Sequence, residues 1–303
     1  MDYFNGARSD TPGLRLAQSE KQLPSRSDIC DLEPGNESWS KAAKTREERM
    51  LNIVIPMAGH GSRFAQAGFA LPKPLIPVHG VPMIRVVIAN LAPTKPHRFI
   101  FICQKAHLEN YALGESLATW APGCSVIPVD QVTEGAACSV LLARELVDNN
   151  DPLMIANCDQ YVDVDINRYL GASERYDGYI MTMKAHDPKW SFVGFDENGR
   201  VAKVVEKEVI SDEATVGIYN FSRGSSFVQA ADRMIRKDFR VNGEFYVAPV
   251  YDELISQGGE VGVYSIGTLN QGMYGLGVPD DLEAFLKLEL SRKATKGLLD
   301  ANN

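Results

Sequence analysis

Residues 53–77 read IVIPMAGHGSRFAQAGFALPKPLIP, and this stretch decides the fold. A short apolar run, typical of a buried strand, passes into a loop that contains Gly59 and Gly61. Glycine has no Cβ, so the backbone N–H groups of such a loop can approach an anion closely. Arg63 adds a fork that suits phosphate oxygens, and Lys73, held between two prolines, adds a point charge. The stretch therefore predicts a site for a nucleoside triphosphate.

Two commoner phosphate motifs do not match this loop. A dinucleotide-binding G-x-G-x-x-G would need a third glycine where Phe64 stands, and the P-loop pattern G-x-x-x-x-G-K-[ST] does not occur in the chain. An ordinary strand-to-helix turn with a solvated arginine and lysine is the alternative interpretation of the same residues. The prediction of a nucleotide site therefore depends on the combined motif and not on the glycines alone.

Composition limits the classes of protein to consider. The 303-residue chain is 45% hydrophobic and 23% charged, as expected for a soluble globular protein, and its net charge of −8 argues against nonspecific nucleic-acid binding. No apolar run reaches the length of about 18 residues that a membrane helix needs. The N-terminus lacks the apolar core of a secretory signal, and the five scattered cysteines show no metal-ligand spacing. We predict a cytoplasmic protein with reduced thiols, without membrane insertion and without a nucleic-acid partner.

The chain changes character near residue 50. Residues 1–50 are polar, with mixed charges and few large apolar residues, and are predicted to form a disordered N-terminal extension. We predict that residues 51–303 form a single domain. Within it we distinguish two halves, residues 51–165, which contain the predicted nucleotide site, and residues 166–303.

The order of predicted elements gives the fold class. Strands are predicted at 52–56, 98–103, 124–129, 152–156, 178–184, 200–206, 215–221 and 260–266, and helices at 82–92, 107–119, 135–147, 223–237, 246–257 and 279–296. This alternation predicts an α/β fold with a Rossmann-like, mixed, mostly parallel central sheet and helices on both faces. Ligands of such sheets bind beyond the carboxyl ends of the strands. The glycine loop and Asp159, each directly after a strand, are therefore predicted to meet.

The combination of G-x-G-x-R-F with P-K-P-L-x-P at this spacing resembles the signature of the sugar-1-phosphate nucleotidyltransferases, also called nucleotide-sugar pyrophosphorylases. The resemblance implies the nucleotide-diphospho-sugar transferase type of fold. It also implies a reaction between an NTP, most often CTP, UTP or dTTP, and a small phosphorylated sugar or sugar-like acceptor, with release of pyrophosphate. Mg²⁺ is the implied cofactor. Family members often form homo-oligomers, although no interface is recognisable in this sequence.

The resemblance also assigns site residues. The catalytic residues would be Arg63, Lys73 and Asp159, with Asp159 as the metal ligand at the end of the apolar strand in LMIANCDQY. The segment from Gln131 to Gly135 resembles the family's base-binding Gln-x-x-x-Gly. The full set of nucleotide contacts implied is Met57, Ala58, Gly59, Gly61, Ser62, Gln131 and Gly135. Acceptor contacts are implied at Ser191, Glu206, Lys207 and Gly217. The polar-aromatic cluster at residues 242–246 suits hydroxyl or amine groups, so Asn242 and Glu244 are predicted as further acceptor contacts; an ordinary turn before a helix is the alternative interpretation.

Three residues depart from the family pattern. Gly275 falls where many members carry a second metal-binding aspartate, Ser191 replaces a glycine that often lies against the sugar ring, and Glu208 replaces the proline of Glu-Lys-Pro. We interpret the chain as a divergent, capsule-type member whose acceptor is not glucose-1-phosphate. A phosphorylated polyol, an amino-acid derivative or a modified sugar would fit, and the product would be an NDP-activated precursor for surface polysaccharide.

Two other classes stay open. A nucleotide-sugar-dependent glycosyltransferase of related fold would use an Asp-x-Asp metal motif, and Asp163-Val164-Asp165 has that pattern. That class does not explain Arg63 and Lys73, a pair that suits a triphosphate. A catalytically inactive binding subunit of the same fold would explain the missing second carboxylate.

Overall fold

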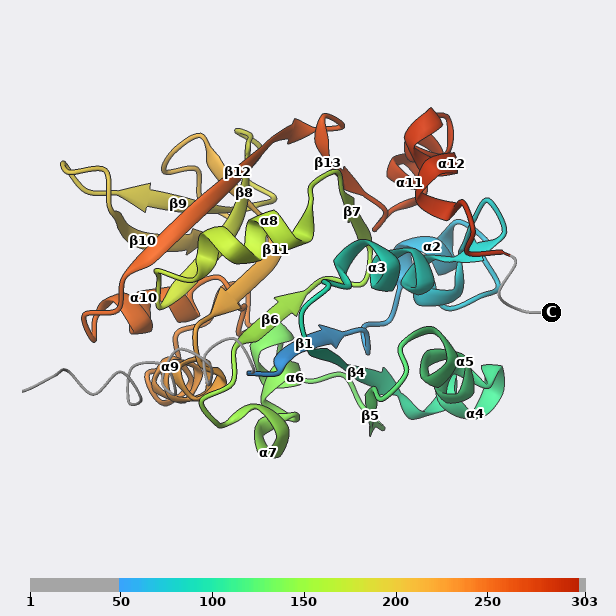
Figure 1. The fold of residues 1–303 in the computed structure, drawn as a ribbon, viewed down its shortest axis with the longest axis horizontal. Coiled ribbons are helices and arrows are strands. Elements are labelled where there is room, and N and C mark those ends of the chain that lie inside the picture. The colour runs from blue at the N-terminus through green and yellow to red at the C-terminus, as the bar shows by residue number, and fades with distance from the viewer. Residues whose placement is uncertain (1–48, 300–303) are drawn as a thin grey trace, which may run out of the picture. The chain divides into compact units, whose positions relative to one another are not determined.

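The computed structural model describes residues 49–299, so the predicted extension at residues 1–50 lies, except for its last two residues, outside the described part of the chain. The described residues belong to one structural unit, Glu47–Asn303. Its centre is a sheet with the strand order β5-β4-β1-β6-β11-β8-β12-β13-β7, to which β9 and β10 attach beside β11 (Figure 1). The strands are β1 (Leu51–Pro56), β4 (His97–Gln104), β5 (Ser125–Val129), β6 (Leu153–Ala156), β7 (Gln160–Val162), β8 (Gly178–Lys184), β9 (Ser191–Phe195), β10 (Val201–Glu206), β11 (Glu213–Phe221), β12 (Val261–Leu269) and β13 (Gly272–Gly275).

The sheet is parallel where the nucleotide motif lies. β1 pairs in parallel with β4 and with β6, and β4 pairs in parallel with β5. β11 runs antiparallel to both β6 and β8, and β12 pairs in parallel with β8. The predicted mixed, mostly parallel sheet is confirmed. Its four parallel strands place the chain segments after β1, β4, β5 and β6 at one edge.

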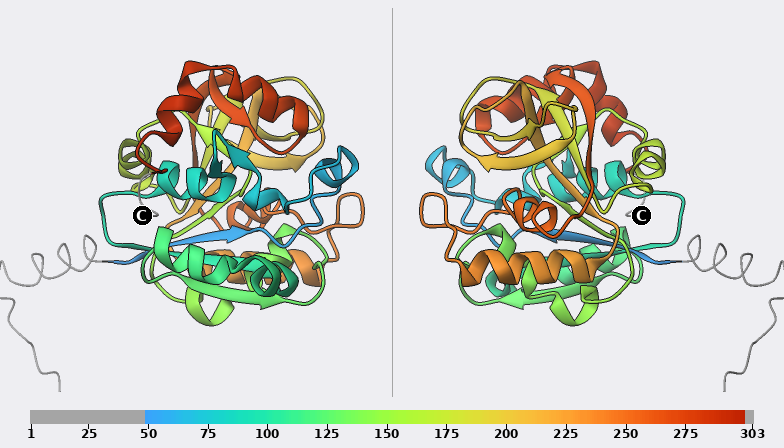
Figure 2. Two further views of the ribbon diagram at one scale, coloured as in Figure 1. Left: turned by 90° about the vertical axis from the view of Figure 1, so that its right-hand side faces the viewer. Right: turned by 90° about the vertical axis from the view of Figure 1, so that its left-hand side faces the viewer.

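Helices cover both faces of the sheet (Figure 2). Alternate residues of β1 face opposite ways: Ile53 and Ile55 enter one hydrophobic core, and Val54 enters the other. The first core is covered by α3 (Met83–Leu91), α5 (Leu113–Trp120) and α8 (Ile166–Ser173). The second is covered by α6 (Ala136–Leu141), α7 (Arg144–Val147), α9 (Gly224–Arg236) and α10 (Val250–Ile255). Burial on both faces explains why the strands read as continuous apolar runs.

Several predicted helices are wrong in extent. The helix predicted at 107–119 is two helices, α4 (Lys105–Tyr111) and α5, because Ala112 between them adopts a left-handed conformation with φ of 48°. The helix predicted at 135–147 divides into α6 and α7, and the one predicted at 246–257 begins only at Val250. The helix predicted at 279–296 is α11 (Pro279–Leu286) followed by α12 (Glu289–Thr295), since Leu288 is extended.

A third hydrophobic cluster connects the two ends of the described chain. Phe64 of the short helix α2 (Ser62–Gln66) is buried with Leu282 and Phe285 of α11. The same cluster includes Ile76, after the 3-10 turn η1 (Lys73–Leu75), and residues of the small hairpin β2 (Pro77–Val78) and β3 (Val81–Pro82). The loop that carries Lys73 is therefore supported by the C-terminal helices.

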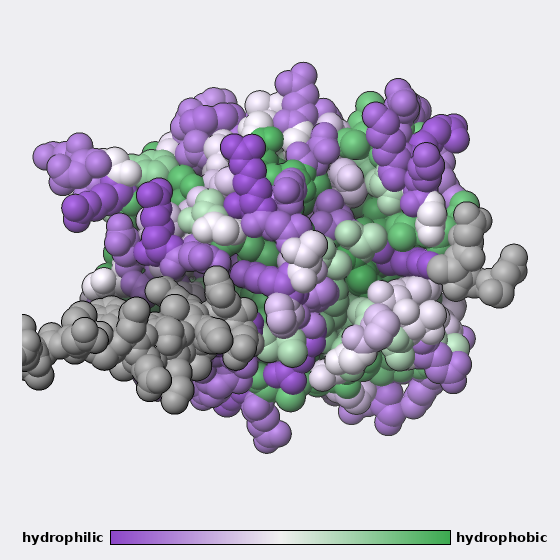
Figure 3. Space-filling view, in the orientation of Figure 1, coloured by the Kyte–Doolittle hydropathy of each residue, from purple (hydrophilic) through white to green (hydrophobic). Residues whose placement is uncertain are grey.

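Polar and apolar residues are intermixed on the face in Figure 3. Among the described residues, no helix combines the length and the apolar character needed to span a bilayer.

Candidate active site

The glycine loop leaves the carboxyl end of β1 and offers a series of unused backbone donors. Gly61 has φ of 60°, the left-handed region that glycine adopts without strain, and it precedes α2. The backbone N–H groups of residues 58–63 donate no hydrogen bond within the described chain. Consecutive free donors in such a turn form a concave site for an anion. The predicted contacts Met57, Ala58, Gly59, Gly61 and Ser62 all lie in or beside this turn.

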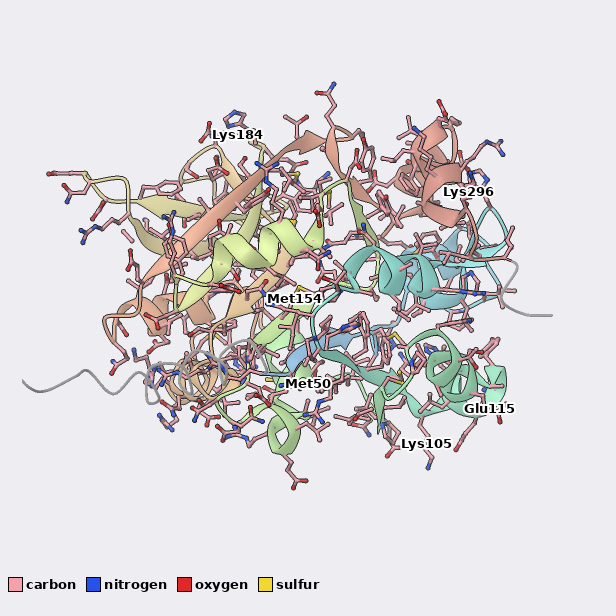
Figure 4. The ribbon with its side chains drawn as sticks, viewed as in Figure 1. Met50, Lys105, Glu115, Met154, Lys184 and Lys296 are labelled. Atoms are coloured by element: carbon pink, nitrogen blue, oxygen red, sulfur yellow. The ribbon has the colours of Figure 1, made fainter. Side chains whose placement is uncertain are left out.

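Lys73 and Asp159 form an ion pair. The Nζ atom of Lys73 lies 2.7 Å from Oδ2 of Asp159, although the residues are 86 positions apart. Both side chains remain partly exposed, at 22% and 23%. A Cβ at Gly61 would lie only 3.3 Å from Cβ of Lys73, so the glycine lets the loop pack directly on the lysine. Asp159 follows β6, the strand that contains Met154, which is labelled in Figure 4.

Electrostatics keep Lys73 charged. Burial acts to lower the pKa of Lys73, but Cys158 and the Asp159 carboxylate outweigh it, so the pKa lies above its usual range. Burial also raises the pKa of Cys158 to about 11, so this thiol is protonated near neutral pH and is no nucleophile. Arg63 is exposed, its guanidinium has no hydrogen-bond partner in the described chain, and it acts to lower the pKa of Lys73. Two cations close enough to influence one another therefore share a single paired carboxylate, Asp159.

Two glycines near the C-terminal helices lie close to acidic side chains. A Cβ at Gly277 would lie 2.7 Å from Oδ2 of Asp159, whereas a Cβ at Gly275 would point at Asp281, 3.1 Å from its Oδ2. Gly277 is therefore the residue that faces Asp159. No group of three or more His, Cys, Asp or Glu residues within 49–299 is arranged to hold a metal ion. Asp159 alone fits Mg²⁺, which commonly takes one or two carboxylates and completes its shell with water and phosphate oxygens.

The predicted base-binding segment closes against a distant part of the chain. Gly135 has φ of 126°, and a Cβ there would lie 2.4 Å from the carbonyl oxygen of Phe245. Around it, Phe245 N–H donates to the carbonyl of Glu134 (2.8 Å) and Ala137 N–H donates to that of Phe245 (3.0 Å). Gln131 precedes this contact in the chain and is exposed. Its side chain has no hydrogen-bond partner in the described chain. The glycine permits the close approach, and the glutamine side chain is free for a ligand.

A pocket of about 270 Å³ adjoins the residues that follow Gly135 and those that follow Phe245. Of the predicted acceptor contacts, Ser191, Glu206 and Gly217 line it. Its other lining residues are Ala136, Asn157, Lys189, Trp190, Thr215, Tyr219, Tyr246, Val247 and Ala248. Sequence reasoning missed Asn157, although it stands only two positions before Asp159, and assigned no role to Lys189.

A buried carboxylate forms the polar floor of the pocket. Glu206 is 8% exposed and accepts a hydrogen bond from the hydroxyl of Ser191. Burial raises the pKa of Glu206, an effect that Ser191 and Lys207 partly oppose and Glu244 reinforces. Ser191, the residue in place of a glycine, therefore orients this carboxylate. A buried carboxylate that keeps unused acceptor capacity suits hydroxyl or amine groups of a ligand.

The departure at Glu208 has a local explanation. Lys207 adopts a left-handed conformation with φ of 58°. A following proline disfavours helical backbone in the residue before it and favours extended conformations, so a proline at position 208 would oppose the backbone seen here. Lys207 Nζ donates to the hydroxyl of Tyr246 at 2.5 Å and lies 4.5 Å from the centre of its ring. The lysine is thereby held beside the pocket, although it is not one of its lining residues.

Two predicted acceptor residues lie farther out. Asn242 and Glu244 belong to an exposed turn, and neither lines the pocket. Glu244 acts on the pocket through its charge, since it contributes to the raised pKa values of Glu206 and Lys207.

The Asp-x-Asp pattern has a structural role. The Asp165 side chain accepts backbone hydrogen bonds from Asn167 (2.9 Å) and Arg168 (3.4 Å) and so caps α8. Ser, Thr, Asp and Asn are the usual residues for this role. Asp163 is exposed, and its backbone N–H donates to Gly272. Helix capping therefore accounts for Asp165, one of the two acidic residues of the pattern that favoured a glycosyltransferase.

Fold and site together define an α/β nucleotide-binding protein with an anion loop, a paired lysine and aspartate, and an adjoining polar pocket. The chain belongs to the nucleotidyl transferase family, whose family model matches residues 53–242. The family contains sugar-phosphate nucleotidyltransferases and is typically metal-dependent.

Individual relatives are distant. The chain is 25% identical over 222 residues to the bifunctional protein GlmU of Ralstonia nicotianae, and 26% identical over 192 residues to the mannose-1-phosphate guanylyltransferase of Mycobacterium tuberculosis. These matches cover 69% and 57% of this chain but only 45% and 49% of the relatives. The chain thus spans about half the length of the curated relatives it matches.

Solved structures agree with the fold. A nucleoside-diphosphate-sugar pyrophosphorylase from Vibrio cholerae RC9 has a TM-score of 0.65 and 28% identity, over 78% of this chain and 100% of that one. The inositol-1-phosphate CTP transferase from T. maritima also has a TM-score of 0.65, over 83% of this chain and 98% of that one, but at 18% identity it is similar in fold alone.

Proposed function

We propose that the protein is an Mg²⁺-dependent nucleotidyltransferase that joins an NTP to a small phosphorylated acceptor and releases pyrophosphate. The observation that carries the proposal is the 2.7 Å pair of Lys73 and Asp159 beside a turn of free backbone donors. A lysine, an exposed arginine and unused amides together suit three phosphates better than the two of a nucleotide sugar.

In the proposed reaction an acceptor phosphate oxygen attacks the α-phosphorus of the NTP. The bond from the α-phosphorus to the oxygen bridging to the β-phosphorus breaks, and pyrophosphate leaves with that oxygen. The nucleophile is already an anion, so the protein needs no general base and acts by positioning and charge neutralisation. Arg63 and the loop amides would hold the departing pyrophosphate, and Lys73 would neutralise the α-phosphate. Asp159 would hold Mg²⁺, whose positive charge offsets the charge on the phosphates.

The acceptor would occupy the pocket above Glu206. Its hydroxyl groups would donate to the Glu206 carboxylate, and Lys207 would hold its phosphate from the rim. This pocket consists mostly of residues after 166, which supports a division into a nucleotide-binding half, 51–165, and an acceptor-binding half, 166–303. Ser191 in the floor supports an acceptor other than glucose-1-phosphate, and we propose an NDP-activated precursor of surface polysaccharide as the product. The nucleotide is proposed to be CTP, UTP or dTTP.

The test is pyrophosphate release with Mg²⁺ from each NTP separately, against a panel of sugar-1-phosphates, polyol phosphates and phosphorylated amino acids. We expect release with one NTP and one acceptor, lost in Lys73→Met and kept in Lys293→Met. Lys293 is a matched control because it lies on α12 and is 69% exposed. Transfer from an NDP-sugar instead of pyrophosphate release would indicate a glycosyltransferase. NTP binding without any turnover would indicate an inactive binding subunit.

A further inference from the structure

One side chain from a neighbouring strand hydrogen-bonds to the backbone of the glycine loop. The amide nitrogen Nε2 of Gln104 donates to the carbonyl oxygen of Ala58 at 2.8 Å and to that of Gly59 at 3.1 Å. No other described side chain hydrogen-bonds to the backbone of residues 57–61. Sequence analysis gave Gln104 no role, because it lies 45 positions beyond the loop and carries no charge.

Holding these two carbonyls also orients two donors. A peptide unit is planar and trans, so its C=O and its N–H point in opposite directions. The carbonyl of Ala58 shares a peptide unit with the N–H of Gly59, and the carbonyl of Gly59 shares one with the N–H of His60. Because both carbonyls turn toward Gln104, both N–H groups turn away from it. Neither N–H has a partner in the described chain.

The position of Gln104 in the sheet fits this role. β4 lies between β1 and β5, and Gln104 is its last residue, in register with Val129 of β5. Gln104 therefore stands at the sheet edge between the glycine loop, which follows β1, and the segment of Gln131, which follows β5. Lys105, labelled in Figure 4, begins α4 directly after it.

We propose that Gln104 is a positioning residue for the triphosphate: it holds the carbonyls of Ala58 and Gly59 so that the N–H groups of Gly59 and His60 face the phosphates. This inference rests on the proposed function of the site. Gln104 acts through the loop and makes no contact with the reacting atoms. Each of its two hydrogen bonds is expected to contribute a factor of about 3 to 10 to the affinity for NTP. Loss of both is therefore expected to weaken NTP binding about 10- to 100-fold.

Three variants of Gln104 test the proposal. Gln104→Met keeps the length of the side chain but removes the donor. Gln104→Glu keeps the shape and places an acceptor against two carbonyls. Gln104→Lys keeps a donor that can reach both carbonyl oxygens. We expect the KM for NTP to rise about 10- to 100-fold in the Met and Glu variants and to stay within about threefold of wild type in the Lys variant. The KM for the acceptor is expected to stay unchanged in all three.

Calorimetric titration of the full-length chain with the preferred NTP, without acceptor, gives a second readout that does not depend on turnover. Glu109→Gln is the control, since Glu109 is an exposed residue of α4 and lies outside the site. An unchanged NTP affinity in Gln104→Met, or a Lys variant as impaired as the Met variant, would overturn the inference. A parallel rise in the acceptor KM would also overturn it, because it would indicate general damage to the site. If wild type itself neither binds NTP nor releases pyrophosphate, the proposed function fails instead.

Discussion

Gly135→Ala tests how the predicted base-binding segment is held. The backbone at Gly135, with φ of 126° and ψ of 172°, lies in a region that is essentially restricted to glycine. A methyl group there would also lie 2.4 Å from the oxygen and 2.6 Å from the nitrogen of the Phe245 backbone. Backbone atoms cannot rotate away as a flexible side chain can, so the two segments would have to separate.

The magnitude follows from these two effects. A non-glycine residue in this backbone region costs about 1–3 kcal/mol. Separation also breaks the hydrogen bonds that Phe245 makes with Glu134 and Ala137, each worth about 1 kcal/mol net. The expected loss in the free energy of unfolding is therefore about 3–5 kcal/mol. Because Phe245 belongs to the segment beside Glu206 and Tyr246, we expect the KM values for nucleotide and acceptor to rise together.

The assay is urea denaturation followed by circular dichroism, with Gly123→Ala as the control. Gly123 also has a positive φ, 79°, but a Cβ there would meet nothing within 4 Å. The control therefore reports only left-handed strain, about 1–2 kcal/mol. Equal losses of stability in the two variants would refute the argument, because they would show that the approach to Phe245 contributes nothing.

Other expected outcomes concern charges. Asp159→Asn is expected to lower the rate of pyrophosphate release about 100- to 1000-fold with little change in melting temperature, and chelation of divalent metal is expected to stop wild-type turnover until Mg²⁺ is returned. Because burial raises the pKa of Glu206, its carboxylate becomes protonated at a higher pH than usual; kcat/KM for the acceptor is expected to fall as the pH decreases through that raised pKa, and Glu206→Gln is expected to remove the part of the pH dependence that belongs to Glu206. Asp165→Ala is expected to cost about 1 kcal/mol of stability, measured by urea denaturation, and to leave kcat unchanged, whereas a metal role would abolish activity.

Many of the strands, and the position of the glycine loop and Asp159 at one edge of the sheet, followed from local sequence. Apolar runs such as 52–56 and 152–156 are buried on both faces, and in a parallel sheet the residues after neighbouring strands must share one edge. Helix ends were less predictable. Ala112 adopts a left-handed conformation that nothing in its residue type indicates, and it interrupts a pattern that reads as one helix.

The site could be predicted only where the type of residue itself indicates a chemical role. Lysine, arginine and aspartate next to strand ends are such residues. Gln104 and Tyr246 are not, since their roles depend on which distant atoms the fold brings to them, the carbonyls of Ala58 and Gly59 for one and Lys207 for the other. Gly277 shows the same limit, because only the direction of its Cβ reveals that it faces Asp159.

The burial of Phe64 against α11 has a consequence for synthesis of the chain. The residues proposed to hold phosphate are translated early, but their support, Leu282 and Phe285, is translated more than 200 residues later. A nascent chain that has emerged from the ribosome only as far as β12 would already contain every side chain proposed to bind nucleotide. It would still lack the helix that packs against Phe64. We therefore expect ribosome-bound chains to acquire NTP binding only after α11 has emerged, so that the first part of the site to be translated is among the last to become functional.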